Sequence, residues 1–128
     1  MQVILASATI LGLDSEFGPS FLDVIPSPSP IPTLLQVATR DTCLLFDLPA
    51  LRRESTATFE ACGDVLAAAF GAAHVLKLGY AFAEDLKVLR RAYPEIAPRC
   101  FAAVASYVEL GDVQVYLHAA GCRDFGAS

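Results

Sequence analysis

An apolar segment near the start of the chain ends in two acidic residues, Asp14 and Glu16, with one residue between them. Side chains of an extended strand alternate between its two faces, so both carboxylates point to the same side. Carboxylate oxygens are the ligands that hard divalent cations such as magnesium prefer. The pattern therefore predicts a metal-binding element at the end of a strand that covers about residues 8–16.

A later helix carries a third acid that can face this strand. Its apolar residues recur at helical spacing and predict a helix over residues 82–93: Phe82, Leu86, Leu89 and Tyr93. At about 100° per residue, Asp85 lies roughly 70° from the centre of that apolar face, on its flank beside Leu89. Asp85 is therefore the acid of this helix that we expect to look toward the sheet.

The elements that position these acids follow from the periodicity of the rest of the chain. Strands are predicted over 33–39, 42–47, 74–79 and 101–108, and helices from Ser55 or Thr56 to Gly71 and over 112–120. Three successive strands without a helix between them predict an antiparallel meander. The strand–helix–strand order that follows predicts a right-handed crossover and a parallel pair. Together they predict an α/β fold with a mixed sheet.

Three segments fall outside this pattern. The proline-rich stretch 19–32 predicts an exposed loop that joins the first two strands, and the tail 121–128 is expected to be frayed. The apolar run Val3–Leu13 lacks a basic start and is too short to span a bilayer, so we interpret it as part of a core strand and expect no membrane anchor.

The composition agrees with a buried sheet and limits the possible partners. Hydrophobic residues make up 55% of the 128 residues and charged residues 18%, which favours a sheet buried on both faces. The net charge of −5 argues against nucleic-acid binding through a broad basic surface, although bound cations can bring a phosphate to an acidic pocket. The four cysteines form no CxxC pair, which argues against a zinc site and favours buried free thiols in a reducing compartment. The chain is expected to be intracellular, nuclear or cytoplasmic.

Three stretches, at residues 12–16, 34–39 and 77–86, resemble in order and spacing the DEDD superfamily of 3′-5′ exonucleases, with DnaQ-like or ribonuclease D-like domains. The likeness covers about residues 8–112 and is greatest to the Werner-type and mutator-class (mut seven homolog) branch. It implies a ribonuclease H-like mixed sheet flanked by helices and a nucleic-acid partner, namely the 3′ end of RNA or single-stranded DNA. It also implies two Mg²⁺ or Mn²⁺ ions, and assigns Asp14, Glu16 and Asp85 as catalytic metal ligands, with Asp14 bridging the two ions.

Three further residues are candidates for contact with substrate. Phe17 directly follows Glu16, and Tyr80 stands five residues before Asp85. Either ring could stack on a terminal nucleotide, with core packing as the alternative. Lys77 stands at the end of a predicted strand and is expected to support the acidic site or to be solvated. Two-metal catalysis would activate a water for attack on the phosphodiester and stabilise the leaving 3′ oxygen.

The third motif of the family, Tyr-x-x-x-Asp or His-x-x-x-x-Asp on a later helix, has no match here. Four residues after Tyr107 stands Gly111, and five residues after His118 stands Arg123. We therefore expect a partial exonuclease domain over 1–128, a truncated or alternatively spliced product that lacks the final helices. Two alternatives stay open: a catalytically inactive isoform that binds nucleic acid or protein, and an unrelated α/β domain with a regulatory acidic cluster.

Overall fold

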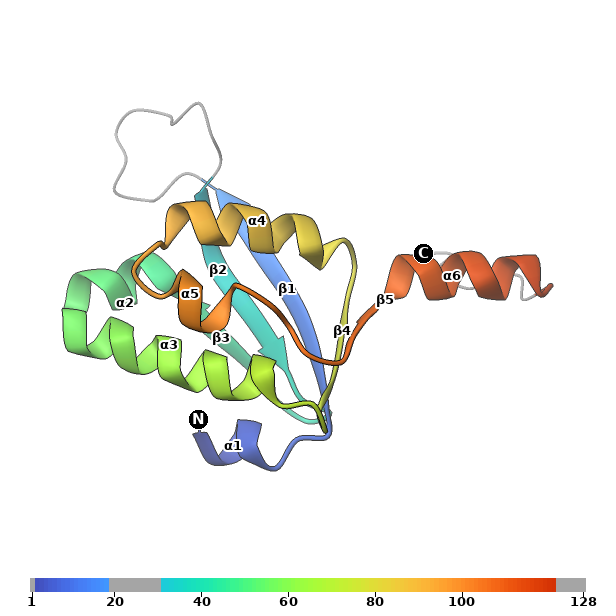
Figure 1. Cartoon of the computed structure of the whole chain (residues 1–128), viewed down its shortest axis with the longest axis horizontal. Helices are drawn as coiled ribbons and strands as arrows, with labels where there is room; N and C mark the ends of the chain where they lie inside the picture. Colours follow the sequence, from blue (N-terminus) through green and yellow to red (C-terminus); the bar gives the residue numbers. More distant parts are fainter. Residues whose placement is uncertain (1, 19–30, 122–128) are drawn as a thin grey trace.

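The strand that carries the paired acids, β1 (Ile10–Gly18), is the centre of a five-stranded sheet with the order β3-β2-β1-β4-β5 (Figure 1). It pairs antiparallel with β2 (Ile31–Ala38), which in turn pairs antiparallel with β3 (Cys43–Asp47). On its other side β1 pairs parallel with β4 (Leu76–Gly79), and β4 pairs parallel with β5 (Tyr107–Glu109). The predicted mixed sheet, an antiparallel meander followed by parallel strands, is confirmed.

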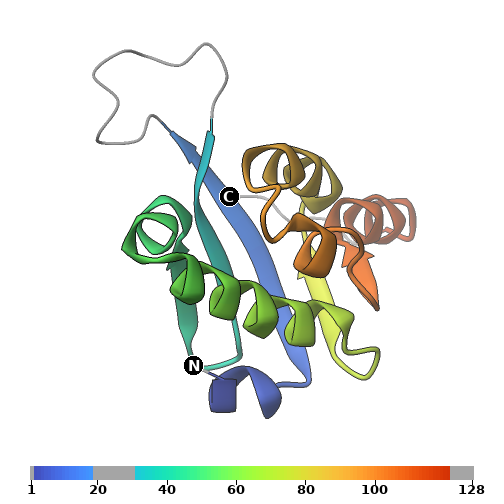
Figure 2. The same cartoon turned by 60° about the vertical axis from the view of Figure 1, so that its left-hand side comes forward.

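The computed structural model describes residues 2–18 and 31–121, and the helices within them flank this sheet. The helices are α1 (Gln2–Ala6), α2 (Leu48–Glu54), α3 (Thr56–Gly71), α4 (Phe82–Ala92), α5 (Ala97–Cys100) and α6 (Leu110–Ala119). Helices α2 to α5 lie on one side of the sheet (Figure 2), whereas α6 projects away from it beyond β5 (Figure 1). None of the side chains of α6 is buried.

The two faces of the sheet differ in burial. The side chains that point toward the helices are buried: Leu11, Leu13, Leu35, Val37 and Phe46. On the opposite face, which we call the open face, Ile10, Leu45 and Leu76 are 51%, 60% and 37% exposed. The prediction of a sheet buried on both faces is therefore wrong for the described residues, because their helices pack on one side.

The N-terminal apolar run does not form one strand as predicted. Residues 2–6 form α1, which contacts α3 and buries Leu5, and β1 begins only at Ile10. A short apolar run fits a buried helix and a buried strand equally well, so periodicity alone could not decide between them.

Two other boundaries differ from the prediction. The predicted strand over 42–47 is followed directly by a helix that the periodicity did not predict, α2. Pro49 stands in its first turn, where the missing N–H costs nothing, and Asp47 caps it by accepting from Ala50 N at 3.0 Å. The predicted strand over 101–108 is reduced to three residues, because Phe101 ends the helical turn of α5 and Ser106 has a positive φ of 57°. The predicted helix capped by Ser55 is confirmed as α3.

The cysteines follow the prediction in part. Cys62 and Cys100 are buried free thiols, and burial raises their pKa to about 11 and about 12. Cys43 is exposed on the open face, contrary to the expectation of burial. Cys122, like the proline-rich stretch 19–30 and the tail from residue 122, lies outside the described residues. Among the described helices, none has the length and apolar character needed to cross a bilayer.

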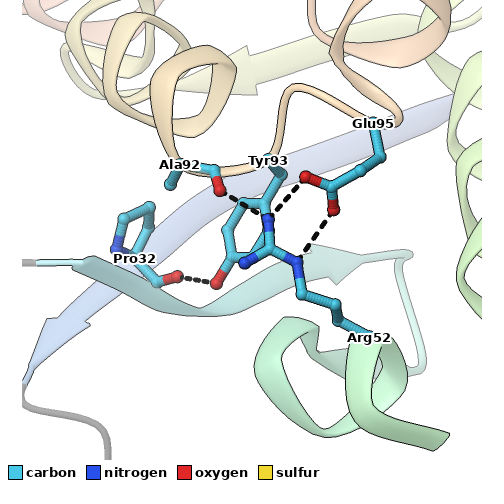
Figure 3. Close-up of polar contacts among 5 residues, drawn as sticks. All are labelled: Pro32, Arg52, Ala92, Tyr93 and Glu95. Carbon is cyan, nitrogen blue, oxygen red and sulfur yellow. Dashed lines mark hydrogen bonds and ion pairs between the residues drawn. The ribbon is translucent and has the colours of Figure 1, made fainter.

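A polar cluster between α2 and the end of α4 fixes the start of β2 (Figure 3). The buried Tyr93 donates its hydroxyl hydrogen bond to Pro32 O at 2.5 Å, and the guanidinium of Arg52 lies over its ring at 4.6 Å. Arg52 also pairs with Glu95 at 2.8 Å and donates to Ala92 O at 2.6 Å. The arginine thus stacks on an aromatic face while its planar donors satisfy two acceptors, which a lysine could not do. This cluster is structural and lies apart from Asp14.

Two glycines of α3 give a matched test of the packing between α3 and α5. A Cβ on Gly63 would lie 2.9 Å from Cγ2 of the buried Ile96, whereas a Cβ on Gly71 would meet nothing within 4 Å. Gly63→Ala should therefore lower the free energy of unfolding by about 1–2 kcal/mol, since overpacking outweighs the gain in helix propensity. Gly71→Ala should be neutral or stabilising by up to about 1 kcal/mol. Urea denaturation measures both, and equal effects would contradict the close approach of α5.

Candidate active site

The first two candidate ligands lie together on the open face of the sheet. Asp14 and Glu16 are exposed, while the residue between them, Ser15, is buried on the helix side, as strand alternation requires. Asp14 pairs with Gln36 of β2, and Glu16 pairs with Leu34 just before a register shift at Phe17. The structure thus places both carboxylates on the same face, with Asp14 at the middle of β1 and Glu16 two residues before its end.

The third candidate ligand, Asp85, lies in the first turn of α4 and reaches β1 through Ser15. Ser15 Oγ donates to Asp85 Oδ2 at 2.8 Å. Partial burial raises the pKa of Asp85, the hydrogen bond from Ser15 opposes that shift, and the negative charge of Asp14 adds to it. Ser15 also donates its backbone N–H to Asp14 Oδ1 at 2.9 Å, so the two acids lie near each other, on either side of Ser15 where β1 meets α4.

The three acids supply the right atoms for a hard divalent cation but do not converge on one point in this conformation. No three side chains of the histidine, cysteine, aspartate and glutamate type are grouped for metal binding anywhere in residues 2–18 and 31–121. Asp14 and Glu16 are exposed to solvent, with one oxygen of Asp14 accepting from Ser15 N at 2.9 Å, whereas one oxygen of Asp85 is held by Ser15 Oγ on the helix side. Two of the predicted ligands therefore fit a shared cation, and the third would first have to turn from Ser15.

A shallow groove of about 350 Å³ runs beside Asp14 on the open face. Its lining comes from four strands and the start of α6: Gly12, Leu13, Asp14, Gln36, Ala38, Cys43, Leu78, Gly79, Tyr80 and Leu110. A larger hollow of about 700 Å³ lies toward the other end of β1 and shares Gly12 and Ala38 with the groove. Each hollow is lined by one acid, Asp41 in the larger one and Asp14 in the groove. The groove is the better candidate for chemistry because Ser15 joins its acid, Asp14, to a second carboxylate, that of Asp85.

Of the two aromatic candidates, Tyr80 is the one that lines the groove. Its ring is 52% exposed, and its hydroxyl donates to Gln114 Oε1 of α6 at 3.2 Å. Phe17 is 39% exposed at the far end of β1, past the register shift. Both rings remain accessible, which a stacking contact with a base would need.

Lys77 does not reach the groove. It is fully buried on the helix side of β4, and its Nζ donates to Ala72 O at the end of α3 with a distance of 2.6 Å. Burial lowers the pKa of this amine. The expected contact of Lys77 with substrate is therefore not supported, because strand alternation turns its side chain to the face opposite Asp14.

Sequence reasoning overlooked Glu109, the last residue of β5. Its carboxylate accepts hydrogen bonds from Ala81 N at 2.7 Å, from Tyr107 Oη at 2.9 Å and from Gly111 N at 3.0 Å. The bonds from Ala81 and then Gly111 hold the pKa of Glu109 below its ordinary value of 4.5. The available signal was an acid directly before a helix, which is a common cap; the link to residue 81 is not visible in the sequence.

The lowered pKa of Glu109 predicts a pH-dependent contribution to stability. Its stabilising effect is complete above about pH 4.5 and is lost as the pH falls through the lowered pKa of the folded state. Glu109→Gln should lower the free energy of unfolding at pH 7 by on the order of 1 kcal/mol, and the difference from wild type should narrow below about pH 4. Urea denaturation at several pH values tests this; a difference that stays constant into acid would contradict it.

Comparison with solved structures identifies the fold. The Aedes aegypti Nibbler EXO domain matches with a TM-score of 0.69 and 20% identity, over 92% of this chain and 50% of that one. The EXD2 exonuclease domain soaked in Mn and GMP matches with a TM-score of 0.60 and 23% identity, over 92% and 53%. The chain has the fold of these exonuclease domains. The catalytic core of RRP6 from Trypanosoma brucei matches with a TM-score of 0.60 and 16% identity, over 91% of this chain and 27% of that one.

The resemblance noted in the sequence is thus confirmed at the level of the exonuclease fold. The chain spans about half the length of the Nibbler and EXD2 domains. No protein-family model and no curated protein sequence matches it. The mixed sheet with helices on one side is the part of the exonuclease fold that the described residues contain.

Proposed function

We propose that this chain provides the acidic half of a 3′-5′ exonuclease site that acts on the 3′ end of RNA or single-stranded DNA. The observation that carries the proposal is that Asp14, which lines the groove, shares the open face of β1 with Glu16, while Asp85 of α4 accepts a hydrogen bond from Ser15 between them. The exonuclease fold over 92% of the chain supports it. Hydrolysis of the phosphodiester is proposed for the complete domain, of which these residues form a part.

Asp14 and Glu16 would hold the divalent cation, Mg²⁺ or Mn²⁺, and Asp85 would complete the shell after leaving Ser15. When bound, such ions lower the pKa of a bound water and neutralise phosphate charge. The chain's own contribution is to bring three carboxylates to the same part of β1 and to keep a groove open beside Asp14. Tyr80, exposed on the groove, is placed to stack on the terminal base.

A second function is favoured by the bond between Ser15 and Asp85. Because this bond engages the third acid, the described conformation lacks a three-acid cation site. The exposed apolar residues of the open face, among them Leu45 and Leu76, offer a surface for a partner. The alternative is therefore a module that binds nucleic acid or protein without turnover.

One assay separates the two functions. The chain is incubated with Mn²⁺ and a single-stranded RNA or DNA oligonucleotide labelled at its 3′ end, and released mononucleotide is measured together with bound oligonucleotide. Early release of the labelled terminal nucleotide that disappears in Asp14→Ala supports the exonuclease. Binding without release supports the binding module. Release that survives Asp14→Ala excludes the proposed metal site. If the chain shows no binding and no release, a nucleic-acid function for it is excluded.

A further inference from the structure

Helix α4, which carries Asp85, begins without a cap from its own segment. Its N-cap residue, Ala81, has a left-handed backbone with φ 51° and ψ 29°, and no side chain of the neighbouring residues caps the helix. A left-handed conformation is strained at a non-glycine residue and persists only where the surroundings enforce it. Some other element must therefore hold the start of α4.

Strand β5 supplies the hydrogen-bond acceptors that cap the start of α4. Ala81 N donates to both carboxylate oxygens of Glu109, at 2.9 and 2.7 Å, and Phe82 N donates to Tyr107 Oη at 3.3 Å. Tyr107 in turn donates its hydroxyl to Glu109 Oε2 at 2.9 Å. The first two amides of the helix start are thus satisfied from β5, and the negative carboxylate stands at the positive end of the helix dipole.

The packing around this contact is tight enough to define one geometry. A Cβ on Gly79 would lie 3.1 Å from Tyr107 Oη and 3.0 Å from Phe82 Cβ, so any larger residue there would require the phenol or α4 to shift. The ring of Tyr107 also lies 6.4 Å from that of the fully buried Phe82. The clamp formed by Glu109 and Tyr107 is therefore held against the core by the ring of Tyr107, while both residues are half-buried.

We propose that Glu109 is a positioning residue whose carboxylate fixes the first turn of α4 and thereby holds Asp85 beside Ser15 and Asp14. Asp85 follows Ala81 by about one helical turn, so a shift of the helix start moves its carboxylate with it. Glu109 also accepts from Gly111 N at 3.0 Å, so the same carboxylate caps α6. The role of Asp85 in chemistry rests on the proposed function, whereas its placement by Glu109 does not.

A double-mutant cycle tests the placement without any activity. Glu109 and Ser15 share no direct bond, so they should be coupled only through α4 and Asp85. The loss in urea midpoint caused by Ser15→Ala should shrink to less than about half in a Glu109→Ala background, whereas distant, independent sites add. Arg99→Ala, which breaks the surface pairs with Glu60 and Asp64, is the control and should be additive with Ser15→Ala. Full additivity with Glu109→Ala would overturn the proposal. If Glu109→Ala does not fold, Glu109→Gln takes its place in the cycle.

Binding of Mn²⁺ gives the second readout, measured by electron paramagnetic resonance under conditions where every variant is folded. Glu109→Ala should weaken Mn²⁺ binding about tenfold, as removal of an outer-shell partner commonly does. Glu109→Gln, which keeps an acceptor for Ala81 N, should restore part of the affinity, and Arg99→Ala should leave it unchanged. If wild type binds Mn²⁺ and Glu109→Ala binds it equally well, the proposal is wrong. If wild type binds no Mn²⁺, the proposed function fails instead, and the cycle alone decides the role of Glu109.

Discussion

Replacing Asp14 by asparagine should abolish nucleotide release and weaken Mn²⁺ binding by on the order of 100-fold, while the free energy of unfolding changes by less than about 0.5 kcal/mol. The side chain is exposed on the open face, so its removal costs little packing. Its charge is the central one of the three acids, because it lies on the same face as Glu16 and acts electrostatically on Asp85. A 100-fold loss corresponds to about 2.8 kcal/mol of binding energy.

The matched control for this change is Asp41→Asn. Asp41 is also exposed, but it lines the larger hollow toward the other end of β1. The two variants alter the net charge equally, so a general electrostatic attraction of Mn²⁺ to this acidic chain would weaken equally in both. Isothermal titration with Mn²⁺ and urea denaturation of both variants distinguish the cases. Equal affinities for Asp14→Asn and Asp41→Asn would exclude a specific site at Asp14.

The placement of the acids could be predicted because it depends on local periodicity. Strand alternation determines that Asp14 and Glu16 share a face, and helical spacing determines that Asp85 lies on the flank of α4 that approaches β1. The same alternation, applied to β4, would have turned Lys77 toward the helices. The charge of Lys77 suggested exposure, whereas the alternation of β4 places its side chain on the buried face. The buried position is tolerated because Nζ donates a hydrogen bond to Ala72 O.

The rest of the site depends on contacts between distant residues, which periodicity does not encode. Glu109 lies 28 residues after Ala81, and nothing in either segment alone indicates that they meet. The hydrogen bond that holds Asp85 to Ser15 spans 70 residues, and it decides whether that carboxylate is free for a cation. The exposure of the open face is likewise a property of the assembled sheet, since composition alone suggested burial on both sides.

Replacing Phe70 by alanine should lower the free energy of unfolding by about 3–5 kcal/mol, the largest effect on stability that we expect from one side chain. Phe70 is fully buried in α3, and its ring lies 6.5 Å from that of Phe82 in α4 and 6.5 Å from that of Phe101 after α5. The ring therefore joins three of the segments that cover the helix side of the sheet. A cavity at this point would also remove the support beneath Phe82, the first residue of α4, so Asp85 should lose its fixed position as well.

Phe17→Ala is the matched control, since it deletes the same ring from an exposed position near the end of β1. Phe17 is 39% exposed, so its loss should cost less than about 1 kcal/mol of stability. If Phe17 stacks on a base, the same change should weaken oligonucleotide binding by about 1–3 kcal/mol, which Phe70→Leu should not do in molecules that remain folded. Urea denaturation together with fluorescence anisotropy of a labelled oligonucleotide measures both quantities. Equal destabilisation by the two alanine variants would contradict the difference in burial between the two rings, because it would require Phe17 to be as closely packed as Phe70.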